Sequence, residues 1–328
     1  MSKISIVKGE DRKENIIRAI KLIENDINKA IKNKKAKQLF IKVNAIDSNF
    51  PLACTHIDAL DATLNNFYEQ FDNIIVGDNS FVFTKDKGGV YRKILNKYSN
   101  VKLSDLTEFE TENIEFKKLD GKISIGEISL LPRKAFTISL ALPKTHDTFV
   151  YTGCLKNMFG CVIKNRGALH ALKLYERVFL NKYVMGNKLK WDNLVNVIKK
   201  TKPDLCILDA YEGMENEGPL FGTKLHLGIA MCSLDGIALD MLASKICGLE
   251  NVPYLSYFSD NSNAPEIVKE GFGDIKEISR KFKPHYKTKY QIRTSTNSLT
   301  PVIDIKFAIS VLKRSYRLKD KIIEKIKG

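Results

Sequence analysis

The sequence predicts an α/β fold in which a mostly parallel sheet is flanked by helices and two lobes enclose a cleft. Short apolar runs alternate with segments of helical periodicity, and strand, helix, strand with compact links is the pattern of a parallel α/β layer. The 328 residues are too many for one small core. A hydrophobic fraction of 44% and a charged fraction of 28% are ordinary for a globular protein.

The N-terminal part of the chain shows the α/β alternation most clearly. A short strand, KISIV, precedes residues 12–33, where isoleucines recur at spacings of three and four and predict one apolar helix face. A buried strand follows at 38–45. Apolar residues at helical spacing predict a helix within 55–71, with Thr55 placed to cap it. The next strand, 73–78, ends in Gly-Asp.

Elements of both kinds continue along the chain, although the pattern between residues 101 and 135 is less regular. The pair Asp120-Gly121 indicates a hairpin. An apolar strand, 136–142, ends at Pro143, so the chain leaves the sheet there. The other expected elements are helices at 86–99, 168–184, 191–200 and 234–248, and strands at 204–210 and 225–233.

We expect one α/β region over residues 1–265 and a basic C-terminal extension over residues 266–328. The periodic pattern weakens past residue 265. Residues 301–328 predict an amphipathic helix and hold eight Lys or Arg against three Asp or Glu. This basic face could contact acidic partners, but a solvated helix face is the more frequent explanation of such a pattern.

The composition favours anionic partners and argues against a membrane span. The net charge is +15, which attracts anions at long range but does not choose between nucleic acid, a membrane surface and phosphorylated small molecules. No apolar segment follows the N-terminus and no run of about 18 apolar residues occurs, so a cytoplasmic protein is expected. The six cysteines form no Cys-x-x-Cys pair, which gives poor support for disulfides or for a zinc or iron–sulfur site.

Residues 142–171, LPKTHDTFVYTGCLKNMFGCVIKNRGALHA, hold the candidate catalytic residues. Two of the five histidines, His146 and His170, flank Lys156 directly after a predicted strand, where ligands bind in open α/β sheets. The imidazoles could bind a metal or move protons. A lysine among apolar neighbours could act as a base or nucleophile, or pair with a bound anion. Taken singly, each is more often an ordinary surface or core residue.

Further polar residues are expected to bind a ligand at the same site. Lys144 adds positive charge just beyond the strand, and Thr152 and Gly153 precede a short predicted helix whose first amides would favour an anion. Asn157 can orient a ligand because its side chain both donates and accepts hydrogen bonds.

Other candidate residues follow the remaining strands. Lys42 and Asn44 come at the end of the strand at 38–45. Asp209 ends the strand at 204–210, a position that suits a metal or a ligand hydroxyl. Asp240 stands inside an apolar helix and needs a partner if it is buried. A structural salt bridge to a lysine of the site and a catalytic role are both open for Asp240.

These motifs resemble those of DUF362, a family defined by a domain of unknown function. Its core has Pro-Lys-x-Lys/Thr-His, Thr-Gly, Leu-Lys-Asn-x-Phe-Gly and a later His, which stand here as Pro143–His146, Thr152–Gly153, Leu155–Gly160 and His170. FIKVN (40–44), PDLCILDA (203–210) with EGP (217–219), and SLDGIALDMLASKICG (233–248) also agree, so the resemblance covers about residues 36–255. Many relatives carry a ferredoxin-type Cys-rich module; its absence here implies no iron–sulfur cluster.

A more distant resemblance is to nickel-dependent lactate racemases. In that family a His lies ten residues before a lysine that carries a nickel-pincer nucleotide, as His146 lies before Lys156, and a further His, here His170, follows. The resemblance implies catalytic or metal-binding roles for these residues, and a divalent transition metal or a nickel-pincer-like cofactor. The chain departs from the pattern because TGCLKN has fewer glycines before the lysine and the last spacing differs.

The leading hypothesis is an enzyme that binds a small anionic molecule, a carboxylate or a phosphate. Histidine and lysine would transfer protons, with or without a metal, in an isomerase-like or racemase-like reaction or in another proton transfer. The alternative is a non-catalytic module that binds nucleic acid or a protein through its basic surface. RSYRLK and KPHYKTKYQIR, where basic and aromatic residues interleave, favour that alternative.

Overall fold

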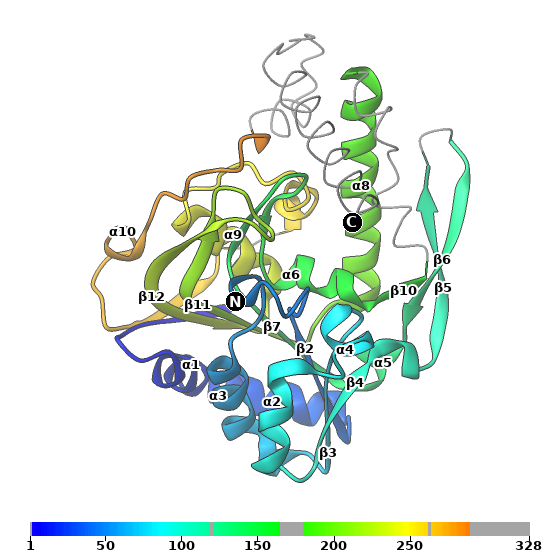
Figure 1. Ribbon diagram of the computed structural model, residues 1–328. Coiled ribbons are helices and arrows are strands. Elements are labelled where there is room, and N and C mark those ends of the chain that lie inside the picture. Colours follow the sequence, from blue (N-terminus) through cyan, green and yellow to red (C-terminus); the bar gives the residue numbers. More distant parts are fainter. Residues whose placement is uncertain (1, 119–120, 165–179, 262–263, 289–328) are drawn as a thin grey trace, which may run out of the picture.

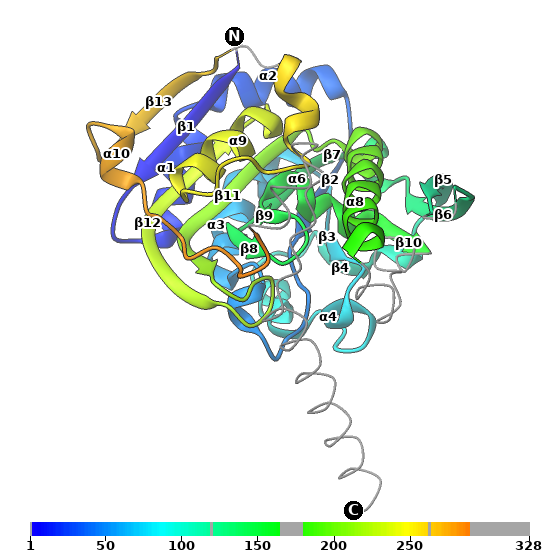
Figure 2. The same ribbon diagram turned by 90° about the horizontal axis from the view of Figure 1, so that it is seen from above.

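The computed structural model describes residues 2–118, 121–164, 180–261 and 264–288. In these residues, helices cover both faces of a large, mostly parallel sheet, as the sequence predicts (Figures 1 and 2). The order along the sheet is β13-β1-β12-β11-β7-β2-β3-β4. These strands are β13 (Glu266–Glu270), β1 (Lys3–Lys8), β12 (Thr223–Ser233), β11 (Leu205–Glu215), β7 (Phe136–Ala141), β2 (Gln38–Val43), β3 (Asn73–Asp78) and β4 (Val101–Asp105).

Along this order, two of the neighbouring pairs of described strands run antiparallel. They are β1 with β12 and β12 with β11, whereas the run from β11 through β7, β2 and β3 to β4 is parallel. A short hairpin of β8 (Lys144–His146) and β9 (Val150–Thr152) attaches to β11. The central strands β2 and β7 are buried along almost their whole length, which explains why their sequences are mostly apolar instead of alternating between apolar and polar residues.

One face of the sheet is covered by α1 (Arg12–Lys21), α2 (Glu24–Lys34) and α3 (Ile57–Phe67). Their apolar side chains pack with Leu39 and Ile41 of β2 in one core cluster. The predicted single helix at 12–33 is therefore two helices. The break at Leu22 and Ile23 contains neither Gly nor Pro, and both halves still bury isoleucines in the same cluster.

The other face is covered by α6 (Cys154–Asn157), α8 (Leu180–Thr201) and α9 (Gly236–Ile246). Trp191 and Leu194 of α8 and Leu239 of α9 lie there in one core cluster with Leu208 of β11. Beside α8 lies a second, three-stranded sheet of β10 (Val162–Lys164), β6 (Ile123–Ser129) and β5 (Thr111–Lys117). Strands β5 and β6 form the hairpin expected around Asp120-Gly121.

Several smaller elements differ from the sequence prediction. The helix expected at 86–99 is a 3-10 helix at Gly89–Asn96, and the short helices α4 (Phe81–Thr84) and α5 (Leu131–Lys134) lie between strands. Most of the helix expected at 168–184 lies outside the described residues, whereas the one expected at 191–200 is the end of α8. No helix in the described ranges is both long enough and apolar enough for a bilayer crossing.

The sheet has a topological switch point between β2 and β7. From β2 the chain crosses α3 to β3 on one side, whereas from β7 it continues to β11 on the other side. The connections that leave the C-terminal ends of these two neighbouring strands therefore diverge. Ligands of open α/β sheets bind in such a crevice.

The beginning of the predicted C-terminal extension packs on the α/β body. Strand β13 pairs in parallel with β1, and α10 (Ile275–Ile278) and the buried Phe282 follow. Residues 289–328, including the amphipathic helix expected at 301–328, lie outside the described residues, so the division at residue 265 stays a prediction.

Candidate functional site

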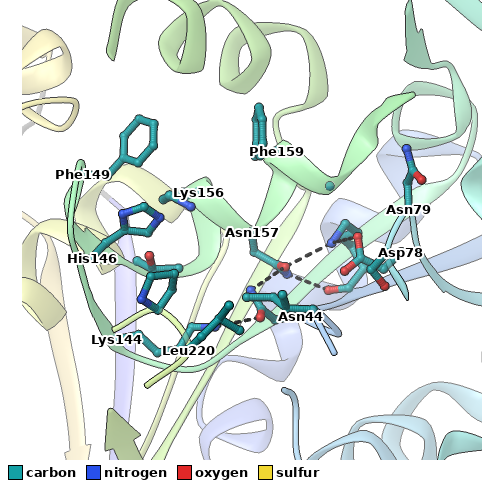
Figure 3. A pocket seen from close by; sticks show the side chains of 16 residues that line it. Asn44, Asp78, Asn79, Lys144, His146, Phe149, Lys156, Asn157, Phe159 and Leu220 are labelled. Carbon is teal, nitrogen blue, oxygen red and sulfur yellow. Dashed lines mark hydrogen bonds and ion pairs between the residues drawn. The ribbon is translucent and has the colours of Figure 1, made fainter. Parts of the chain in front are cut away.

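A cavity of about 470 Å³ opens at this switch point (Figure 3). Its wall comes from the C-terminal ends of β2 and β3, the β8–β9 hairpin, α6 with the turn after it, and a loop at residues 219–220. The lining residues are Lys42, Asn44, Ile46, Asp78, Asn79, Ser80, Lys144, His146, Phe149, Thr152, Lys156, Asn157, Phe159, Gly160, Pro219 and Leu220.

Lys42 is held in the cavity floor by three acceptors. Its Nζ lies 2.9 Å from Asp78 Oδ1 and donates to Val43 O at 2.8 Å and to Asn157 Oδ1 at 3.1 Å. The side chain is 1% exposed. The strand end FIKVN therefore supplies a buried ion pair with Asp78, the last residue of β3, and this pair adds no net charge to the cavity.

Asn157 is the centre of the hydrogen-bond network in the floor. Its Oδ1 accepts from Lys42 and, at 3.4 Å, from Asn44 Nδ2. Its Nδ2 donates to Lys42 O at 2.8 Å and to Ser139 Oγ at 3.1 Å. Because both ends of this amide bond the protein, its evident task is to tie α6 to β2 and β7; the ligand contact predicted for it stays a prediction.

Gly160 lets the chain pass closely over the ion pair. A methyl group at this position would overlap Asp78 Oδ1 and lie 2.5 Å from Lys42 Nζ. In the LKNMFG stretch, Asn157 therefore binds the floor strands through hydrogen bonds, and Gly160 leaves space for the ion pair of Lys42 and Asp78. Neither function depends on backbone flexibility.

Lys144 is a completely buried amine at the edge of the same network. Its Nζ donates to Asn44 Oδ1 at 2.9 Å and to Ala53 O at 2.7 Å, and both acceptors are uncharged. Burial lowers the pKa of Lys144 to about 7, and the ammonium groups of Lys156 and Lys42 act in the same direction. A substantial fraction of Lys144 is therefore neutral at physiological pH.

Lys156 is a partly exposed amine between aromatic rings. Its Nζ lies 4.9 Å from the ring centroid of Phe149 and 5.9 Å from that of Phe159, both within reach of a cation–π attraction. Figure 3 shows Lys156 beside the ring of His146, at the end of the cavity opposite Asp78 and Asn79.

His146 is buried and held on its Nδ1 side. Nδ1 accepts from the Thr148 amide at 3.1 Å and lies 3.0 Å from Asp147 Oδ1, and the ring meets Phe149 edge-on. These Nδ1 contacts are alternatives: a neutral ring accepts from Thr148, whereas a protonated ring can donate to Asp147. Burial raises the pKa of Asp147, but His146 and Lys287 outweigh it and hold that pKa well below its usual range.

The start of α6 is not available to an external anion. The Cys154 and Leu155 amides donate to Asp240 Oδ1 and Oδ2 at 2.9 and 2.8 Å. Gly153 does not line the cavity, and a side chain there would collide with Asp240. The expected anion at this helix start is thus a carboxylate of the protein itself, and Asp240 caps α6 through backbone amides instead of pairing with a lysine.

Two hydroxyls of the cavity wall are unsatisfied. Among the described residues, neither Thr152 Oγ1 nor Ser80 Oγ has a hydrogen-bond partner, although both atoms are buried. A buried hydroxyl without a partner loses its hydration without compensation, so a water or a ligand atom would relieve that loss.

Asp209 and His170 do not join this set in the structure as described. Asp209 does not line the cavity: its carboxylate faces Arg12, whose Nε lies 3.4 Å away, and Arg12 also pairs with Glu212. Burial raises the pKa of Asp209 to about 6, against the effect of Arg12. His170 lies outside the described residues, so its predicted catalytic and metal-binding roles stay predictions.

The described wall of the cavity does not fit a metal ion. It offers one imidazole, three amines and one carboxylate that is already paired with Lys42. Across the described ranges, no group of three His, Cys, Asp or Glu side chains is placed to hold a metal. Of the segments that favoured nucleic-acid binding, RSYRLK and the end of KPHYKTKYQIR lie outside the described residues.

Sequence reasoning missed several lining residues. Asp78, Asn79 and Ser80 follow β3, and the Gly-Asp end of that strand was the available signal, since C-terminal ends of neighbouring parallel strands meet at one edge. The aromatic pair Phe149 and Phe159 carried no such signal, because buried aromatics are most often plain core residues.

The family model described as "Domain of unknown function (DUF362)" matches residues 39–245. The chain belongs to the DUF362 family. All of the described residues that line the cavity fall inside the matched range, so the cavity lies within the DUF362 domain of this chain.

Two known proteins are similar to parts of this DUF362 chain. It is 30% identical over 113 residues to the "Thylakoid-associated protein sll1697" of Synechocystis sp., a match that covers 34% of this chain and about a third (32%) of that protein. The lactate racemase apoprotein from Thermoanaerobacterium thermosaccharolyticum superposes with a TM-score of 0.39 at 13% identity, over 67% of this chain and 53% of that one. The structural likeness is too weak to carry a role over.

Proposed function

We propose that the cavity binds a small anionic molecule, a carboxylate or a phosphate, and that His146 moves a proton on it. The main support is the charge of the cavity wall. Among the described residues, the wall contains three lysines and one carboxylate, that of Asp78, which Lys42 neutralises. An anion that enters would gain favourable electrostatic energy without displacing a protein carboxylate.

Lys156 is the residue proposed to hold the anion. Its side chain is partly exposed in the cavity wall, whereas those of Lys42 and Lys144 are buried. The neighbouring Phe149 and Phe159 rings keep water away from the contact, which strengthens an ion pair relative to one in bulk solvent.

His146 is the proposed general acid or base. Asp147 next to Nδ1 would stabilise the imidazolium, so the ring can accept a proton from the bound molecule and later return it. In Figure 3 its ring and the side chain of Lys156 lie next to each other, so one ligand could contact both.

The proposal is tested by proton nuclear magnetic resonance in D₂O with a panel of small carboxylates and phosphates. We expect at least one compound to bind and to exchange a carbon-bound proton with solvent. His146→Gln should lose exchange but keep binding, whereas Lys156→Met should lose binding by about tenfold or more. Lys164→Met serves as the matched control, because Lys164 is exposed and pairs with Glu127 away from the cavity.

Unchanged exchange in the His146 variant would remove histidine from the mechanism. Unchanged binding in the Lys156 variant would remove the proposed anion site.

A further inference from the structure

Among the described residues of the wall, Lys156 is the amine best placed to meet a ligand. The amines of Lys42 and Lys144 are almost completely buried, and Lys42 already pairs with Asp78. Lys156 is partly exposed in the same wall. Its ammonium is a compact point charge, which suits a single carboxylate.

The wall around Lys156 is apolar. The two phenyl rings flank its Nζ, and Pro219 and Leu220 line the cavity as well. A ligand whose anionic group reaches the ammonium must place the rest of its body against these side chains. An aromatic or aliphatic body would fit such a wall, because its burial removes apolar surface from water on both partners.

The backbone groups that favour phosphate are already occupied. Phosphates typically bind several amides at a helix start. At the helix start next to this cavity, the Cys154 and Leu155 amides bind Asp240. A carboxylate needs fewer donors than a phosphate does, so the groups that remain in the wall suit it better.

We infer that the ligand is a monocarboxylate with an aromatic or aliphatic body, and not a phosphate ester. This inference rests on the proposed function, since it assigns a substrate class to the same cavity. The carboxylate pairs with Lys156, and the body packs between Phe149, Phe159 and Leu220.

Isothermal titration calorimetry of the full chain with matched probes measures the binding affinities that test the inference. The probes are phenylacetate, hexanoate, acetate, phenylacetamide, phenyl phosphate and inorganic phosphate. We expect phenylacetate or hexanoate to bind about tenfold or more tightly than acetate and than both phosphates. Phenylacetamide has the same body as phenylacetate without the charge, and its affinity should be about tenfold or more lower than that of phenylacetate. Phe159→Ala should weaken phenylacetate binding several-fold but leave the weak acetate binding unchanged, and Lys164→Met should change neither.

The outcomes separate the two proposals. Tighter binding of either phosphate probe than of the carboxylates would overturn the substrate class while the anion site stands. Equal binding of phenylacetate and phenylacetamide, or no binding of any anionic probe, would overturn both. Equal binding of acetate and phenylacetate would overturn the role of the apolar wall.

Discussion

Asp240 accepts the backbone amide of Leu155 at 2.8 Å, so a carboxylate on α9 fixes the start of α6. The second oxygen of the same carboxylate accepts the Cys154 amide. Helix α6 carries Lys156 and Asn157, so the position of the proposed anion site depends on a residue far along the chain. Burial raises the pKa of Asp240 to about 7, although the two amide hydrogen bonds oppose that shift.

Asp240→Ala should therefore destabilise the protein and weaken ligand binding together. The change leaves two buried amides without an acceptor, and each unsatisfied group costs about 1–3 kcal/mol, partly offset because a buried charge is also removed. Urea unfolding at neutral pH measures the effect.

The matched control is Asp235→Ala, which removes an ordinary cap from α9. Its loss should be about 1 kcal/mol, with the affinity of the cavity unchanged. If the Asp235 variant is the less stable one, Asp240 does not have the role assigned here.

How far the sequence predicts this site can be judged from individual residues. Lys42, Lys144, His146 and Lys156 were expected at one site because they follow strands or a strand–helix link at one sheet edge, and all four line the cavity. The expectation that Asp209 stands at the end of a strand is wrong. Strand β11 runs on past a register shift between Ala210 and Glu212 to Glu215, so Asp209 lies inside the strand.

Other features of the site depend on tertiary contacts that no local pattern encodes. Apolar periodicity places Asp240 on a buried helix face but cannot say that α9 packs against the start of α6. Likewise, Gly160 is a plain turn glycine in the sequence, and only the fold places the ion pair of Lys42 and Asp78 beneath it.

Lys144 should make stability depend on pH. Its pKa in the folded chain is about 7, against an ordinary value of 10.5. Between these pH values the unfolded chain binds a proton that the folded chain does not, so the free energy of unfolding gains about 1.4 kcal/mol per pH unit from this residue as pH rises. The penalty is complete below pH 7 and absent above 10.5.

Lys144→Met keeps the length of the side chain and removes the titration. The unfolding free energy of the wild type minus that of the variant should therefore rise steadily from pH 7 to 10. Urea titrations at several pH values within that range measure it. Parallel curves for the two proteins would show that the amine does not titrate there.

Gly160→Ala should disrupt the cavity floor. The added methyl group meets Asp78 Oδ1 and Lys42 Nζ, so the buried ion pair must separate or the chain above it must move. We expect a loss of about 3 kcal/mol in unfolding free energy, typical of a broken buried pair. Gly273→Ala is the control: its nearest neighbour is a side-chain oxygen of Glu277 at the exposed start of α10, and the Glu277 carboxylate accepts hydrogen bonds from the Gly273 and Asp274 amides, so the stability of the variant should stay within about 1 kcal/mol of wild type.

Thr152→Val should change stability and ligand affinity in opposite directions. Thr152 Oγ1 is buried in the cavity wall without a hydrogen-bond partner among the described residues, so the nearly isosteric valine removes an unsatisfied group and should raise the unfolding free energy by about 1 kcal/mol. If the hydroxyl bonds the ligand, affinity for phenylacetate should fall about fivefold to tenfold. Thr152→Ser, which keeps the hydroxyl, should retain the affinity; a valine variant that binds as well as wild type would remove Thr152 from the contact.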